Sequence, residues 1–484
     1  MTQLLAAALV AYVVLTYALA LRSRGRIRSA EDFLVAGRRL PLGLAAATLL
    51  ATWFGAGTML TAADAIYGGG LRLAALEPIG AGLCLLLAGT LLAERLWSLR
   101  LLTVADLFRV RYGARAELLC AALTVPTFLG WIAVQFVALA GILELFFAVD
   151  PAVGVPLVAA VATGYTLLGG MWSVALTDAL QLALLLVGLV ILGVAVVAEL
   201  GGGALSAGLA RIAAEAPPGH LELVPTARLG ELVDWLGVLA IASLGNLSGQ
   251  DLLSRIFAAR SARVARRACQ IAGVAYLAFG AIPALLGLAA AVILGPGEAS
   301  AVLPRLAALS LSPALAVVFT LALASAVFST VDSALLAPAG VLAQNLLVPR
   351  LPGRSALALN RLCVVVVALA ALALAFVGSG AYGLLEDAYA LGLVALFVPL
   401  VFALGARRRR EASAIAAMLV GTGVWAAHLT LGWEHLGGAA LGVPVPREIA
   451  GASLACVAFF IVERRAPPAD HDADAAARTT PTAL

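Results

Sequence analysis

The sequence contains no lysine, and charged residues of every kind make up only 12% of its 484 residues. Soluble domains carry about 25% charged and roughly 45–50% apolar residues. Here 63% of the residues are hydrophobic, the mean hydropathy is +1.05, and apolar runs of about 20 residues recur from end to end. This composition excludes a water-soluble catalyst and a single-span receptor. It predicts an all-α polytopic membrane protein.

Cysteine and histidine are also scarce. The five cysteines stand singly in apolar segments without metal-site spacing, so they are expected to be small buried hydrophobic side chains. The four histidines form neither an HxxE nor an HExxH arrangement, which gives no indication of a zinc site or an intramembrane protease. No clustered acid, base or nucleophile stands out within an apolar run, and we predict that the protein is not an enzyme.

Thirteen apolar segments are predicted to cross the membrane as helices. They lie near residues 4–21, 43–66, 73–94, 118–147, 151–168, 174–198, 232–253, 267–294, 307–346, 358–377, 384–404, 411–431 and 447–462. Most of the 31 basic residues, all arginine, fall in alternate connections, at 22–42, 95–117, 254–267, 347–361, 405–410 and after 462. The positive-inside rule makes this side cytoplasmic, with the N-terminus outside and the C-terminus inside.

The connections divide the chain. An extra helix and a cytoplasmic loop occupy 1–42, and an outer loop with a short surface helix is predicted at 199–231. Two C-terminal helices are predicted within 405–465. Residues 466–484, rich in Pro, Asp, Ala and Thr, cannot bury a core and are expected to form a disordered cytoplasmic tail.

Polar or interrupted positions inside the spans are functional candidates, because lipid-facing helices do not need them. The first is Ala51–Thr58 in the second span, where Gly55 and Gly57 lie between apolar halves. A helix break there would free the backbone carbonyls of Ala51 and Phe54 to bind a cation. The alternative is a small-residue face for close helix packing.

The second candidate is a polar stripe in the ninth span. Ala326, Ser329, Thr330 and Ser333 lie on one helical face, and two hydroxyls beside a carbonyl can supply part of an oxygen cage for a small cation. The alternative is that the hydroxyls bond back to the preceding turn. The neighbouring Asp332 favours a function, because a carboxylate at membrane depth is costly.

The third candidate is Tyr165–Gln181. A glycine pair is predicted to end one span at the cytoplasmic face, and Thr177, Asp178 and Gln181 lie within one turn at the mouth of the next. This arrangement suits a relay for an ion leaving toward the cytoplasm. It is equally consistent with a polar helix start, where the helix dipole favours Asp178.

Taken in order, these motifs resemble the sodium:solute symporter family. The stretches that carry the resemblance are Glu31–Arg38, Ala51–Gly57, Tyr165–Gln181, Ser254–Ser261 and Ser329–Ser333, which together cover about residues 30–400. The resemblance implies a LeuT-like core of two inverted five-helix repeats at 43–198 and 232–404. It implies Na+ as the transported coupling ion and Asp178 on the sodium exit path. The implied sodium ligands are the carbonyls of Ala51, Phe54 and Ala326 and the hydroxyls of Ser329 and Thr330.

Residues 50–60 and 117–142 resemble the choline-transporter branch, in which aromatic rings enclose a quaternary ammonium group. Trp53 and Trp131 match two of these aromatic positions, whereas Ala81 and Gly249 occupy the other two, so choline is not specified. Polar residues are also predicted to line a solute pocket at mid-membrane, namely Gln135, Asn246, Ser248 and Gln250. Glu77 is expected either to attract a cation or to face the outside water. Betaine, choline-like, amino-acid and carboxylate solutes all stay open.

The predicted function is sodium-coupled import of a small organic solute across the cytoplasmic (inner) membrane by alternating access. Its predicted partners are the solute, sodium and the lipid bilayer, with no nucleic acid. One alternative is a proton-coupled carrier, in which a titratable group would replace the sodium cage. Another is a non-transporting membrane sensor built on a transporter scaffold. The oligomeric state is left open.

Overall fold

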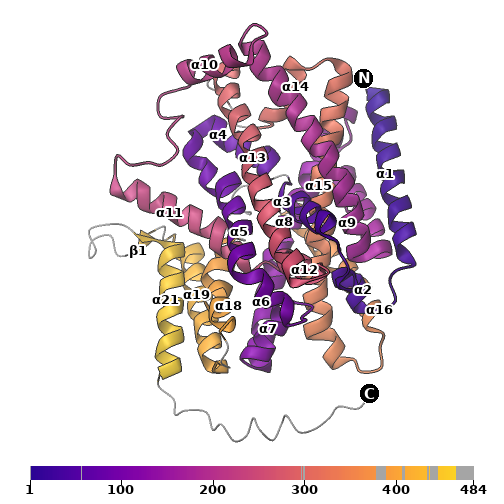
Figure 1. The fold of residues 1–484 in the computed structure, drawn as a ribbon, viewed down its shortest axis with the longest axis vertical. Helices are drawn as coiled ribbons and strands as arrows, with labels where there is room; N and C mark the ends of the chain where they lie inside the picture. The colour runs from indigo at the N-terminus through magenta and orange to yellow at the C-terminus, as the bar shows by residue number, and fades with distance from the viewer. Residues whose placement is uncertain are drawn as a thin grey trace, which may run out of the picture.

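The computed structural model describes residues 2–55, 57–295, 297, 300–377, 389–405, 409–432, 435–436 and 445–464. These residues are almost entirely helical (Figure 1). The α-helices are α1 (Thr2–Arg24), α2 (Ala30–Val35), α3 (Leu42–Trp53), α4 (Ala62–Gly69), α5 (Ala81–Leu87), α6 (Ala93–Ser98), α7 (Val104–Arg111), α8 (Ala114–Phe147), α9 (Pro151–Leu200), α10 (Leu205–Glu215), α11 (Leu229–Leu244), α12 (Gln250–Ala258), α13 (Ala262–Leu294), α14 (Val302–Ser310), α15 (Pro313–Val341), α16 (Ala356–Ala375), α18 (Val398–Ala403), α19 (Glu411–Leu431) and α21 (Arg447–Arg464).

Shorter helical turns connect or extend these helices. They are η1 (Ala36–Arg38), η2 (Gly57–Thr61), η3 (Leu71–Ala75), η4 (Leu76–Gly80), η5 (Ala88–Leu92), η6 (Gly245–Ser248), η7 (Leu342–Leu347), η8 (Val348–Arg350) and η9 (Gly392–Phe397). One antiparallel pair of two-residue strands, β1 (His435–Leu436) and β2 (Val445–Pro446), lies before α21.

In the part of the chain that the structure describes, eight helical stretches are long and apolar enough to cross a membrane, and a bent pair, Leu42–Trp53 with Gly57–Gly69, makes up to nine. The fifty-residue α9 is one of the eight and contains two of the predicted spans. These meet at Gly170, whose positive φ of 49° kinks the helix. The shorter apolar stretch Tyr389–Ala403 and helices α19 and α21 lie at the last three predicted segments. The count of thirteen and the orientation stay predictions.

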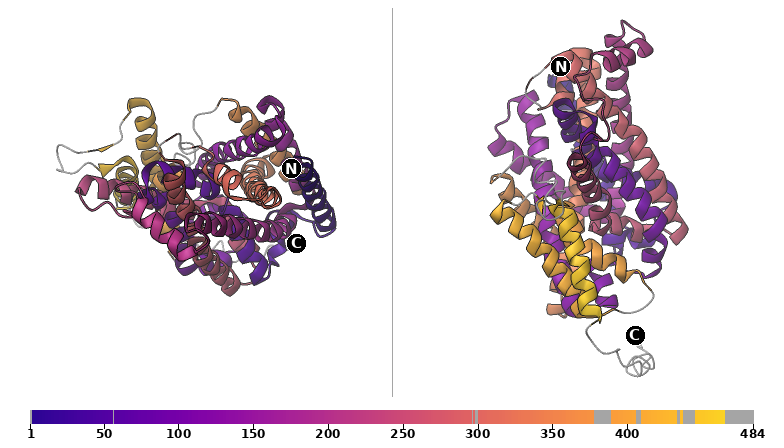
Figure 2. Two further views of the ribbon diagram at one scale, coloured as in Figure 1. Left: turned by 90° about the horizontal axis from the view of Figure 1, so that it is seen from above. Right: turned by 90° about the vertical axis from the view of Figure 1, so that its left-hand side faces the viewer.

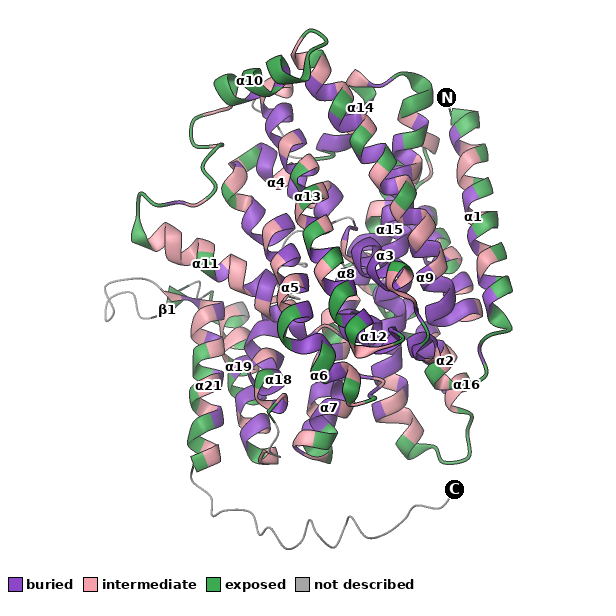
Figure 3. Cartoon of the chain, viewed as in Figure 1, coloured by how far each residue is buried: buried purple, intermediate pink, exposed green. Residues whose placement is uncertain are grey.

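Helices α9 and α15 pack against each other at the centre, with α1, α3 and α8 against them. Nearly every residue of α15 from Phe319 to Val341 is buried, and Figure 3 shows burial concentrated in this central region. The peripheral α1 (indigo in Figure 2) exposes apolar side chains instead, with Val10 63% and Val14 62% exposed. Large exposed apolar side chains along a helix are unfavourable in water but suit contact with lipid.

Some predicted segments differ from the structure or extend beyond its described residues. The segment at 307–346 divides into α14 and α15, because Leu311 and Ser312 are extended ahead of Pro313 and proline disfavours a helical residue before it. Part of the segment at 384–404 lies outside the described residues, as does the predicted tail at 466–484. The predicted outer loop at 199–231 contains one short, mostly exposed helix, α10 (Figure 1).

Candidate functional site

The second predicted span is broken where its glycines lie. Helix α3 ends at Trp53, and its axis and that of Gly57–Gly69 differ by 54°. A β-carbon on Gly55 would lie 2.0 Å from the Thr330 Oγ1, so only glycine allows the break to pack this closely on α15. The Thr330 hydroxyl donates to the Thr52 carbonyl at 3.0 Å and to the Ala326 carbonyl at 3.2 Å. The break and the hydroxyl stripe of α15 are therefore in direct contact.

The five residues proposed as sodium ligands are all buried in this region. They are Ala51, Phe54, Ala326, Ser329 and Thr330. The Ser329 hydroxyl donates to the Asp178 Oδ1 at 2.5 Å, whereas Thr330 donates to backbone carbonyls. A hydroxyl that donates its proton keeps two lone pairs. Both hydroxyl oxygens can therefore still act as acceptors toward a cation.

Asp178 is fully buried on α9, rather than at an open helix mouth. Its carboxylate accepts hydrogen bonds from Thr48 and Ser329. The Arg255 Nη2 lies 3.8 Å from the Asp178 Oδ2, and these two side chains are 1% and 0% exposed. Residues from α3, α9, α12 and α15 thus meet in one buried polar cluster.

Arg255 has further partners in this cluster. Its Nε donates to the Thr48 carbonyl at 3.3 Å, and its Nη2 donates to the Ser333 hydroxyl. On the neighbouring Asp332, Oδ1 accepts from Ser333 at 3.1 Å, whereas the buried Oδ2 has no partner among the described residues. One guanidinium therefore lies among two carboxylates. An additional cation would be electrostatically favourable there.

The seventh predicted span is also broken. Helix α11 ends at Leu244, η6 follows, and α12 begins at Gln250 after the extended Gly249. The glycines at 245 and 249 are the signal that could have found this break from the sequence. It faces the break after α3, because the Trp53 Nε1 donates to the Asp251 Oδ2 at 2.7 Å.

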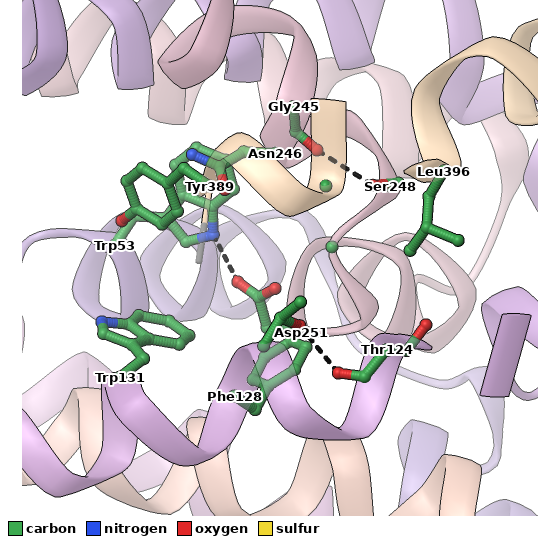
Figure 4. Close-up of a pocket in the computed structure, with 13 residues that line it drawn as sticks. Trp53, Thr124, Phe128, Trp131, Gly245, Asn246, Ser248, Asp251, Tyr389 and Leu396 are labelled. Atoms are coloured by element: carbon green, nitrogen blue, oxygen red, sulfur yellow. Dashed lines mark hydrogen bonds between the residues drawn. The ribbon is translucent and has the colours of Figure 1, made fainter. Parts of the chain in front are cut away.

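A cavity of about 50 Å³ lies between these two breaks and α8 (Figure 4). Its described lining residues are Trp53, Thr124, Thr127, Phe128, Trp131, Gly245, Asn246, Ser248, Gly249, Asp251, Tyr389, Gly392 and Leu396. Four of the residues predicted at the solute pocket, Trp53, Trp131, Asn246 and Ser248, are brought together here. Aromatic rings and a few polar groups in a concave site are typical of small-molecule pockets.

Two other predicted solute residues lie elsewhere. Gln250 points toward the segment before α7, where its Oε1 accepts from the Val104 amide at 2.6 Å and its Nε2 donates to the Leu102 carbonyl at 3.2 Å. Gln135 is buried on α8 and is not among the described residues that line the cavity. The sequence shows that both residues carry polar amide side chains. It does not show in which direction each side chain points.

Glu77 does not face water. It is 4% exposed, accepts from the Tyr276 hydroxyl at 2.5 Å and accepts from the Thr58 hydroxyl at 3.1 Å. The Tyr276 hydroxyl also donates to the Trp53 carbonyl at 3.0 Å. Glu77 therefore supports the segment just after the break through Tyr276 and Thr58.

Phe128, Tyr389 and Asp251 are among the cavity-lining residues that sequence reasoning missed. For Asp251 the signal was present, because an ionisable residue within an apolar span is a functional candidate by default. Phe128 lies near Trp131 on α8, with ring centroids 5.8 Å apart. Tyr389 carries no local signal, because aromatic residues are common in apolar helices.

Known proteins share the arrangement of these motifs along the chain. Residues 33–421 match the Sodium:solute symporter family. The chain belongs to the sodium:solute symporter family. It is therefore a multi-pass membrane protein of a transporter family rather than an enzyme, as the sequence predicts.

The chain is 26% identical over 416 residues to the high-affinity choline transporter 1 of Caenorhabditis elegans, covering 81% of this chain and 70% of that protein. It is 33% identical over 265 residues to the high affinity choline transporter 1 of Homo sapiens, covering 53% of this chain and 43% of that protein. With the sodium/glucose cotransporter of Vibrio parahaemolyticus it shares 24% identity over 306 residues, covering 60% and 55%. The human and Vibrio matches thus span less than two thirds of those proteins.

Solved structures share the fold of this chain at low sequence identity. A Na+-coupled sialic acid symporter in a substrate-bound outward-open state matches with a TM-score of 0.79 and 16% identity, covering 96% of this chain and 98% of that one. Mhp1, a nucleobase-cation-symport-1 family transporter, matches with a TM-score of 0.62 and 15% identity, covering 89% and 92%. The mostly helical fold predicted from the sequence is thereby shared with LeuT-like transporters, whereas the two inverted five-helix repeats stay a prediction.

Proposed function

We propose that the symporter couples inward movement of sodium to import of a small organic solute across the cytoplasmic membrane by alternating access. The observation that carries this proposal is the position of Trp53. Its indole lines the cavity, whereas its backbone belongs to the break that packs against Thr330. A cation bound by the carbonyls of Ala51 and Phe54 would therefore order the residue that contacts the solute.

In this proposal the sodium cage combines the α3 break with α15. The carbonyls of Ala51, Phe54 and Ala326 and the hydroxyls of Ser329 and Thr330 supply oxygen ligands without a fixed charge. Binding would hold the two elements together and stabilise one state of the transporter. Because such coupling is reciprocal, the solute must tighten sodium binding by the same factor.

Asp178 is proposed to receive sodium as it leaves the cage toward the cytoplasm. The Ser329 hydroxyl already contacts the Asp178 carboxylate. A sodium ion released from Ser329 would therefore find this negatively charged ligand next to it. The Arg255 guanidinium close to Asp178 weakens the attraction of this carboxylate for a cation. Asp178 is therefore suited to transient rather than tight binding.

The driving force can be bounded. One sodium ion crossing about 100 mV gains roughly 2.3 kcal/mol, and a tenfold gradient adds about 1.4 kcal/mol. The sum of about 3.7 kcal/mol would sustain accumulation of a neutral solute on the order of 500-fold at one-to-one stoichiometry.

The proposal is tested in the double variant Ser329→Ala/Thr330→Ala. Loss of two ligands is expected to raise the half-saturating sodium concentration at least about tenfold, equivalent to about 1.4 kcal/mol. The measurement is the sodium-dependent thermal shift of the purified protein, followed by uptake in proteoliposomes. A matched control is Ser98→Ala/Thr430→Ala, because both of these exposed hydroxyls bond to carbonyls of their own helices. An unchanged sodium requirement in the first variant would refute the sodium cage.

Proton coupling is a second candidate, favoured by the buried Asp332 Oδ2 that lacks a partner among the described residues. In that case uptake would be driven by a pH gradient without sodium. An Asp332→Asn variant would abolish uptake driven by the pH gradient. Sodium coupling instead predicts no uptake when potassium replaces sodium, at any pH gradient.

A further inference from the structure

We propose that the solute is an organic cation whose nitrogen carries N–H donors, and that Asp251 is its counter-ion. This inference rests on the proposed function, because it concerns the solute cavity of that transport cycle. It names a class of solute that the motifs leave open.

The Asp251 carboxylate is part of the cavity wall. The residue is 5% exposed, and its Oδ2 accepts the indole N–H of Trp53 at 2.7 Å (Figure 4). It lies in the first turn of α12, where the helix dipole favours a negative charge. An ionised carboxylate has about four acceptor positions. The indole N–H of Trp53 and the backbone amides of Asp251 and Leu252 use three of these positions, which leaves acceptor capacity for a ligand.

Arg255 attracts this carboxylate electrostatically but does not form an ion pair with it. In the part of the chain that the structure describes, no ion pair joins Asp251 to an arginine or a histidine. Arg255, one turn further along α12, touches only the Asp251 backbone carbonyl, at 2.9 Å, and directs its charge to Asp178 and Ser333. A buried carboxylate is costly without a counter-charge. A cation entering the cavity would supply one.

Gly249 makes room for the carboxylate. A β-carbon at position 249 would lie 2.7 Å from the Asp251 Oδ1 and would force it to move. Gly249 and Asp251 both line the cavity. The absence of a side chain at position 249 leaves the space that the Asp251 carboxylate occupies. The position of the Oδ1 depends on having glycine there.

The other walls suit the same kind of solute. Trp131, Phe128 and Tyr389 surround the cavity with Trp53, and aromatic faces attract cations. A carboxylate binds best to an N–H group of a charged nitrogen, through a short charge-assisted hydrogen bond. A quaternary ammonium group has no N–H to donate. The acid therefore favours primary, secondary or tertiary amines, or guanidinium compounds, over quaternary ones.

The experiment uses a series of probes that differ only in methylation, namely ethanolamine, N-methylethanolamine, N,N-dimethylethanolamine and choline. Thermal-shift titrations of the purified full chain are run in sodium and in potassium. The wild type is expected to bind the N–H-bearing members at least about tenfold more tightly than choline. Asp251→Asn is expected to weaken binding of these members by a similar factor and to remove the preference.

A second variant guards against a general loss of folding. Gly249→Ala keeps the carboxylate but displaces it, so it should also reduce the preference for N–H-bearing probes. The matched controls are Gly423→Ala, whose new β-carbon meets no atom within 4 Å, and Asp234→Asn, whose half-exposed carboxylate pairs with His435. Both controls should retain the wild-type order of affinities.

The results separate this inference from the proposed function. Sodium-dependent binding of choline or betaine as tight as that of ethanolamine, or failure of every N–H-bearing probe to bind in sodium, would overturn the inference while leaving sodium coupling intact. Binding that is the same in sodium and in potassium would overturn the proposed function instead. Retention of the amine preference in Asp251→Asn would show that the acid is not the counter-ion.

Discussion

The α3 break separates two regions with opposite chemistry. On the α15 side it meets hydroxyls and carbonyls, and the Thr330 hydroxyl bonds to the Thr52 carbonyl. On the α12 side it meets aromatic rings and a carboxylate, and the Trp53 indole bonds to Asp251. Neutral oxygen ligands suit a small hard cation, whereas rings and an acid suit a larger organic one. Only one or two residues along the chain separate the two regions.

Helix α12 links the two regions a second time. Its Asp251 side chain lines the cavity, and its Arg255 side chain, one turn later, reaches Asp178 in the polar cluster. Movement of α12 would therefore change both regions together. Coupling in this fold therefore requires no long pathway, because the same two discontinuous helices contribute to both regions.

The largest effect is expected when the charge of Arg255 is removed from α12, the helix that links the two regions. In Arg255→Met, Asp178 stays buried without its cationic partner, and breaking a buried pair costs about 3–5 kcal/mol. We expect a large fall in melting temperature and loss of uptake. Thermal unfolding of the purified protein in lipid or detergent measures this directly.

The control for this prediction is Arg266→Met, because Arg266 pairs with Glu94 at 3.6 Å where both side chains are about half exposed. Its effect should be below about 1 kcal/mol. Adding Asp178→Asn to Arg255→Met should recover part of the lost stability, since the uncompensated carboxylate is then neutral. A wild-type melting temperature for Arg255→Met alone would show that the cluster does not depend on this pair.

A smaller but more selective effect is expected from Gly55→Ala. The new β-carbon would lie 2.0 Å from the Thr330 Oγ1, which must separate the break from α15. Overpacking of this kind typically costs about 1–3 kcal/mol, and the sodium-induced thermal shift should disappear. Gly43→Ala in the same helix is the control, because its β-carbon would meet no atom within 4 Å. A sodium response equal to that of wild type would place the cation elsewhere.

Hydropathy and local pattern predicted one region better than the other. The stripe on α15 follows helical periodicity within a single unbroken helix, so the burial and shared face of Ser329 and Thr330 could be predicted without tertiary information. The break at Ala51–Gly57 was also visible, because two glycines and a threonine interrupt an apolar run. Both signals are local in the sequence.

The solute cavity depends on information that is not local. Each residue of a helix turns by about 100° from the one before, so Gln250 and Asp251 point in different directions once α12 begins. The direction of that start is set by η6 and Gly249, and their conformation depends on packing against other helices. Gln250 was therefore predicted to face the solute, although it contacts the Leu102–Val104 backbone, and Asp251 was overlooked.

The smallest effect is expected from a substitution at Trp53, which changes the solute cavity but keeps the backbone at the sodium cage. Trp53→Phe keeps an aromatic face toward the cavity and keeps the backbone of the break, but it removes the N–H that Asp251 accepts. Loss of a hydrogen bond to a charged group costs about 1.5–3 kcal/mol, and the freed acceptor position can partly be satisfied by the solute. We therefore expect amine affinity to change by roughly tenfold or less, while the half-saturating sodium concentration measured without solute stays the same. If sodium binding weakens as much as solute binding, the indole also supports the cage, and the two regions cannot be treated as separate sites joined only by the backbone.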